Sequence, residues 1–259
     1  MELEYVIISL AAFATAVLTF FSGFGLGTLL TPVMMLYFPA ELAIALTGVV
    51  HFFNNLFKLT LVGRQANGGV LLRFGIPAVV FALPGAWLLL RLSSMAPLFS
   101  YTAFGRTIAV YPVKFTVALL LIFFALMDLV PALRNLQFGA GKLPLGGALS
   151  GFFGGLSGNQ GALRSAFLIR AGLSKEAFIG TAVVVSAFVD FTRLGVYATR
   201  LKAVPLQDNL ILVLCATGAA IAGALLGNRL LKKVTLHFVQ VVVAVLLIVV
   251  SLALGAGWL

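Results

Sequence analysis

Long stretches without a charged residue recur along the chain, and this constrains the fold more than any other feature. Among them are residues 6–40, 74–90, 115–127, 177–189, 210–227 and 238–259. A helix needs roughly 20 apolar residues to cross a bilayer, and several of these stretches approach or exceed that length. Only 9% of the residues are charged, against about 25% in soluble domains. The sequence therefore predicts an all-α integral membrane protein.

The charged residues that remain lie mainly between the apolar stretches, and they give a net charge of +10. Lys and Arg in such connecting segments set membrane orientation, so we expect membrane lipids rather than nucleic acid as the partner. Glu2 and Glu4 stand where a signal peptide would be basic, and we therefore keep the N-terminus as structure. With Cys215 as the one cysteine and no nucleotide-binding motif, we expect no metal and no cofactor.

The two halves of the chain resemble one another at a spacing of 135 residues. The pairs are Ser22 with Ser157, Gly23 with Gly158, Glu41 with Glu176, Asn55 with Asp190, and Lys58 with Arg193. We therefore predict a first transmembrane repeat at 1–131, a linker at 132–142 and a second transmembrane repeat at 143–259. They would form one membrane domain.

Each half begins with an apolar stretch that is interrupted by glycines, near 22–27 and near 157–161. We expect two half-length helices around each break, forming a re-entrant hairpin. Such interrupted segments at matching positions are typical of transporter binding sites. Three full spans would follow in each half, at 41–62, 70–91, 112–130, 176–198, 206–230 and 235–254. An odd number of spans makes the repeats inverted.

Charge supports this inverted arrangement. With the N-terminus outside, more Lys and Arg fall on the inner side, as the positive-inside rule requires. If each broken stretch crossed the membrane once instead, the repeats would be parallel and the cations would divide equally.

Polar residues at the breaks and on the helices after them are candidates for substrate binding, because ionisable groups inside a membrane are costly. Arg164 follows the second break, where helix N-termini also attract anions; alternatively, its side chain extends to the interface. His51, Asn54, Asn55 and Lys58 form one helical stripe, and we expect Lys58 near the inner interface. The full candidate set is Ser22, Gly23, Gly25, His51, Asn54, Asn55, Ser157, Gly158, Asn159, Gln160, Gly161, Arg164, Asp190 and Arg193.

Two of these candidates have a simpler alternative explanation. Asp190 and Arg193 lie three residues apart on one helical face, so they would be able to pair with one another without touching substrate. A hydrogen bond that only stabilises structure is likewise an alternative for His51.

Three segments together resemble the TauE/SafE family of sulfite and organosulfonate transporters. They read SGFGLGTLLTP, PAELAIALTGVVHFFNN and GLSGNQGALRSAFLIRAGLSKEAFIGTAVVVSAF, and the resemblance extends over nearly the whole chain. It implies export of a small sulfur-containing anion such as sulfite, sulfoacetate or another organosulfonate, without ATP.

We therefore expect a secondary transporter in the cytoplasmic membrane that works by alternating access, not an enzyme. A proton or sodium gradient is the candidate driving force, and small-residue helix faces make a homodimer the expected assembly. Uptake of a related anion is the first alternative. The second is an intramembrane serine protease, because Gly155, Leu156, Ser157 and Gly158 match a GxSG motif with His51 or His237 as base.

Overall fold

Helices dominate the computed structural model, which describes residues 2–22, 25–103, 105–134, 137–199, 209–230 and 236–258. Five helical segments in these ranges are long and apolar enough to cross a membrane, and two shorter apolar helices accompany them. The chain is thus a multi-pass membrane protein, as its composition predicts. The helices are α1 (Glu2–Ser22), α2 (Gly27–Met35), α3 (Ala40–Val62), α4 (Gly68–Val70), α5 (Ile76–Ser93), α6 (Pro112–Leu129), α7 (Pro131–Arg134), α8 (Leu143–Ser157), α9 (Gly161–Leu168), α10 (Lys175–Ala198), α11 (Leu210–Leu230) and α12 (Leu236–Gly255).

The six predicted full spans agree with these helices to within a few residues. A π-helical turn at Leu71–Gly75 joins α4 to α5, and the three together form the second span. Residues 206–208 and 235 of the predicted spans lie outside the described ranges. The structure also contains a β-hairpin that the sequence analysis did not predict, formed by β1 (Phe99–Ala103) and β2 (Arg106–Val110). Gly105 in its turn has a φ of +72°, which glycine adopts without strain.

Both glycine breaks interrupt a helix where the sequence predicts an interruption, but the flanking helices are unequal. The expectation of half-length helices is wrong for α1, which has 21 residues and is therefore about 31 Å long. The reason is that no glycine or proline occurs between Glu2 and Ser22. At the second break, α8 has 15 residues and α9 has eight. Gly158, with a φ of +75°, ends α8.

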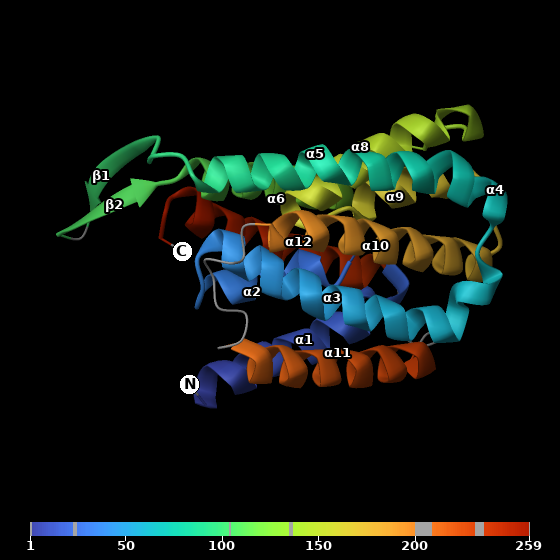
Figure 1. Ribbon diagram of the computed structural model, residues 1–259, viewed down its shortest axis with the longest axis horizontal. Coiled ribbons are helices and arrows are strands. Elements are labelled where there is room, and N and C mark those ends of the chain that lie inside the picture. The colour runs from blue at the N-terminus through green and yellow to red at the C-terminus, as the bar shows by residue number, and fades with distance from the viewer. Residues whose placement is uncertain are drawn as a thin grey trace.

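The long helices lie roughly alongside one another, with the β-hairpin projecting at one end (Figure 1). At this end, which we call the β end, the Tyr101 hydroxyl donates to the Ala256 carbonyl at 2.7 Å. The turn after α2 is also here, since residues 35–41 line a pocket with Tyr111 and Lys114.

The other end, which we call the opposite end, holds the turn between α3 and α4 and the turn after α9. There the Asn67 amide donates to the Thr181 hydroxyl at 2.9 Å, and the Phe138 amide donates to the Ala166 carbonyl at 3.2 Å. The turns that follow α2 and α9 therefore lie at opposite ends of the molecule.

Small residues bring two pairs of helices into close contact. Gly147, Gly151 and Gly155 of α8 lie directly against backbone carbonyls of the span that contains α5. Gly223 and Gly227 of α11 lie in the same way against α1. Both small-residue faces are thus used within the chain, so they give no support to the predicted homodimer, which stays a prediction.

We predict that Gly151→Ala will destabilise the protein, because a Cβ at this position meets the backbone carbonyl of Ala78. Overpacking of this kind typically costs about 1–3 kcal/mol. Gly218→Ala in α11 is the matched control: a Cβ there has nothing within 4 Å, and alanine favours a helix by about 1 kcal/mol over glycine. Thermal unfolding of the purified variants in detergent should show a lower midpoint for Gly151→Ala only. Equal midpoints would contradict the packing described.

Candidate functional site

The carboxylate of Asp190 is the centre of a buried polar cluster between α3 and α10. These helices run antiparallel, with Gly48 of α3 near Leu194 and Gly180 of α10 near Val62. His51 Nδ1 lies 2.6 Å from Asp190 Oδ2, and Asn55 Nδ2 donates to the same oxygen at 2.9 Å.

Arg193 holds the other carboxylate oxygen. Its Nε donates to Asp190 Oδ1 at 3.0 Å, and its Nη2 lies 2.9 Å from that atom. Asp190 and Arg193 therefore pair with one another, which was the alternative explanation for these two residues. The same carboxylate also holds His51. Tyr197, one turn further along α10, donates its hydroxyl to the Gly155 carbonyl and so links α10 to α8.

Both glycine breaks pack on this cluster. A Cβ on Gly25 would lie 2.9 Å from His51 Nε2, and a Cβ on Gly158 would lie 2.6 Å from Arg193 Nη1. Neither position has room for a side chain, which explains why glycine is needed at both.

The two breaks also touch each other. The Thr28 hydroxyl donates to Asn159 Oδ1 at 3.0 Å, and a Cβ on Gly27 would lie 3.2 Å from the Gly158 carbonyl oxygen. Segments about 130 residues apart in the chain therefore meet inside the helix bundle.

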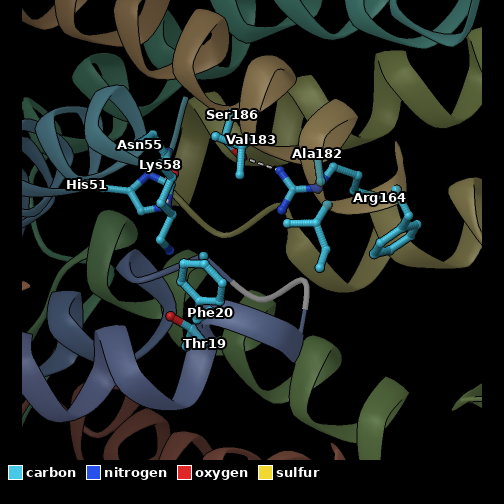
Figure 2. A pocket seen from close by; sticks show the side chains of 12 residues that line it. Thr19, Phe20, His51, Asn55, Lys58, Arg164, Ala182, Val183 and Ser186 are labelled. Carbon is cyan, nitrogen blue, oxygen red and sulfur yellow. Dashed lines mark hydrogen bonds between the residues drawn. The ribbon is translucent and has the colours of Figure 1, made fainter. Parts of the chain in front are cut away.

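A small cavity of about 30 Å³ lies beside the first break. Figure 2 shows Arg164 on one side, His51 and Lys58 on the other, and Phe20 and Thr19 below them. The Arg164 side chain is 3% exposed and donates a hydrogen bond to the Ser186 hydroxyl. Arg164 thus points into the cavity, and the alternative that it extends to the interface is wrong.

The position of the Lys58 side chain also differs from the expected one. We expected it near the inner interface, but its side chain is 6% exposed, with Nζ 5.2 Å from the centroid of the Phe20 ring. The neighbours of its ammonium group are the Phe20 ring from α1 and the Asn54 amide, both inside the protein.

The structure brings some of the predicted site residues together around the cavity and places others elsewhere. Gly25, His51, Asn55 and Arg164 line the cavity, while Asp190, Arg193 and Gly158 lie behind His51 as described above. Asn54 faces α11: with its amide oriented to satisfy its hydrogen bonds, its nitrogen donates to the Ala220 carbonyl at 3.3 Å.

The remaining candidates belong to the breaks themselves. Ser157 is buried and its hydroxyl donates to the Phe153 carbonyl at 3.0 Å, within its own helix. Asn159, Gln160 and Gly161 are buried at the second break. Ser22 ends α1, and Gly23 lies outside the described residues.

Several residues that line the cavity are not in the set of candidates predicted from the sequence. Among the polar ones are Lys58, Thr19 and Ser186. A signal for Ser186 was present, because it lies 135 residues after His51, the spacing that relates the other repeated positions. Thr19 carries no comparable signal, since a threonine in an apolar helix is common.

A family model described as "Sulfite exporter TauE/SafE" matches residues 8–254. The chain belongs to the TauE/SafE family. No curated protein and no solved structure matches it. The family match confirms the resemblance noted in the sequence and identifies a membrane transporter of the sulfite-exporter type. Transport, rather than enzymatic catalysis, is the activity that this family implies.

We predict that Asp190→Asn will strongly destabilise the protein, because it leaves the buried Arg193 without its carboxylate. Breaking a buried ion pair in this way typically costs about 3–5 kcal/mol. Glu176→Gln is the control, since Glu176 is an exposed carboxylate on the same helix. Thermal unfolding in detergent should separate the two variants.

The double variant Asp190→Asn/Arg193→Gln extends the same test. It should lose less stability than the sum of the losses in Asp190→Asn and Arg193→Gln, because it removes both charges of the pair. Additive losses would show that the two side chains do not act as a pair.

Proposed function

We propose that this protein exports a small sulfur-containing anion, such as sulfite, sulfoacetate or another organosulfonate, across the cytoplasmic membrane. The observation that carries the proposal is the cavity inside the bundle, whose walls include Arg164 and Lys58. Among the described residues that line it, none is acidic. A cationic cavity within a membrane domain favours an anion, because buried charges need compensation.

Arg164 is the proposed primary ligand of the anion. A sulfonate or sulfite presents three oxygens, and a guanidinium is able to bond two of them at once. The Ser186 hydroxyl and the Asn55 amide also line the cavity and supply neutral polar groups. Asn159 Nδ2, a buried donor at the junction of the two breaks, has no hydrogen-bond acceptor among the described residues, and in this proposal it contributes to the path of the anion.

In the proposed mechanism, two inverted repeats expose the cavity alternately to the two sides of the membrane. The turns after α2 and after α9 lie at opposite ends of the molecule, which is what inversion of the two hairpins requires. Asn55 and Asp190, whose positions correspond in the two repeats, bond directly to one another at 2.9 Å. Equivalent residues meet in this way only near the axis that relates two repeats. Residues 1–131 and 143–259, joined by 132–142, would then rock against one another around the cavity.

The opposite end is the proposed cytoplasmic side. It carries Arg64, Arg73, Lys142, Arg170 and Lys175 near its turns, while Arg91, Arg106, Lys114, Glu41 and Glu4 belong to the β end. This distribution obeys the positive-inside rule with the N-terminus outside. The cavity lies toward the cytoplasmic side in this assignment, as an exporter open to its substrate requires. Coupling to protons or sodium and assembly as a homodimer remain part of the proposal.

Two alternative functions have different degrees of support. Uptake of a related anion would use the same cavity, and the direction of flux distinguishes it from export. A serine protease at Ser157 is disfavoured by the local geometry, because the Ser157 hydroxyl donates to the Phe153 carbonyl of its own helix and His51 Nε2, the nitrogen that would act as base, lies against Gly25. Ser157 is better explained as a residue that helps to end α8.

The experiment that tests the function is flux in proteoliposomes that contain the purified protein. Sulfite and a panel of sulfonates should cross the membrane when a proton or sodium gradient is imposed, and without ATP. Arg164→Ala should nearly abolish binding. The affinity should fall by roughly 30-fold to several thousand-fold, because the anion loses a buried charged partner. Arg164→Lys should weaken binding less, because it keeps the charge and loses only the planar fork.

Arg170→Ala is the matched control for these variants, since Arg170 is an exposed arginine just after the same helix, where it bonds Gln137. It should leave affinity, measured by calorimetry, unchanged. Wild-type affinity in Arg164→Ala would remove this residue from the site.

The proposed orientation can be tested with single cysteines in a Cys215→Ser background. Ser100→Cys, in the exposed β-hairpin, should react with a membrane-impermeant maleimide in intact cells. Gly141→Cys, where a side chain has open space around it, should react only after the membrane is permeabilised. The reverse labelling pattern would contradict inverted repeats with the N-terminus outside, and equal labelling of both sites in intact cells would contradict the span α6 that separates them.

A further inference from the structure

Two cationic side chains from different halves of the chain line the same cavity. Lys58 comes from α3, in the first repeat, and Arg164 comes from α9, in the second. Figure 2 shows them on opposite sides of the cavity, with the Phe20 ring below Lys58. An anion bound at Arg164 would therefore leave a second positive charge on the facing wall.

The described residues that contact the Lys58 ammonium group carry no negative charge. Its Nζ lies over the Phe20 ring at 5.2 Å, and the oriented Asn54 amide accepts a hydrogen bond from it at 3.3 Å. Both groups are neutral. A cation–π contact and an amide offset only part of the cost of removing an ammonium group from water.

Asp190 does not serve as the counter-charge of Lys58. One of its oxygens is bonded to His51 and Asn55, and the other is bonded to Arg193. The carboxylate is also absent from the residues that line the cavity. The net charge that faces the bound anion is thus set by Lys58 and Arg164 together.

We propose that Lys58 binds a second negative charge on the substrate, so that the protein selects dianions over monoanions. The substrate class would be a sulfonate that carries a carboxylate, or a doubly charged sulfur oxyanion. Arg164 takes the three-oxygen group by its planar fork, and Lys58 takes the second acid group as a point charge that requires no particular geometry. This inference rests on the proposed function, because it assumes that the cavity is the anion site.

The test compares two probes that have the same carbon chain and the same sulfonate but different charge. Sulfoacetate carries a sulfonate and a carboxylate, whereas isethionate carries a sulfonate and a neutral hydroxyl. Binding of each is measured by calorimetry on purified wild-type protein. We expect sulfoacetate to bind about 30-fold more tightly or better, as is typical when a charged partner is gained.

Variants of Lys58 then locate the preference. Lys58→Gln should weaken sulfoacetate binding by about 30-fold and isethionate binding by a clearly smaller factor, because isethionate lacks the second negative charge, and Lys58→Arg should keep the preference for sulfoacetate. Lys142→Gln is the matched control, since Lys142 is an exposed lysine with Nζ 5.6 Å from the centroid of the Phe138 ring. It should change neither affinity.

Several results would overturn the inference. If wild-type protein binds both probes equally, Lys58 does not select charge, and this result requires no folded variant. If Lys58→Gln weakens both probes by the same factor, the lysine has a structural role. In both cases the proposed function stands, because binding of sulfonates and its dependence on Arg164 are unaffected. If neither probe binds and no sulfonate or sulfite is transported, the proposed function fails together with the inference.

Discussion

The centre of this protein depends on one buried carboxylate, that of Asp190. An isolated charge inside a membrane domain is costly, and here it is compensated by donors from two helices. His51 and Asn55 on α3 hold one oxygen, and Arg193 on α10 holds the other. The carboxylate therefore fixes α3 against α10. It also orients His51 and Arg193, the two side chains on which the glycine breaks pack.

The bilayer explains why the breaks lie where they do. Unwound backbone in a membrane is tolerated only where protein or a water-lined cavity surrounds it, and both breaks meet this requirement by packing on the cluster and on each other. Glycine serves two purposes here. It interrupts the helix, and at Gly25 and Gly158 it leaves space for a polar side chain of the neighbouring helix. Helix ends and charged side chains are thereby brought to the same cavity.

How far the sequence predicted the structure varied from element to element. The start of α3 was predicted to within one residue, because Pro39 just before the helix and Glu41 in its first turn mark a helix N-terminus in the sequence. The length of α1 was not, since the break was treated as a midpoint although no glycine precedes Gly23. In the site, Arg164 and His51 were predicted and do line the cavity. Asn54 belongs to the same helical stripe as His51, but its amide nitrogen donates to the Ala220 carbonyl of α11.

The sequence by itself determined that the chain crosses a membrane several times and is broken twice at related positions. These properties follow from local composition, which the bilayer constrains regardless of how the helices pack. Only the tertiary structure decided which charges meet. Lys58 lies close enough to the end of α3 to reach the interface, and the Phe20 ring from α1 and the Asn54 amide direct it inward instead. The partners of a buried charge come from distant segments, and no local pattern in the sequence encodes their distance.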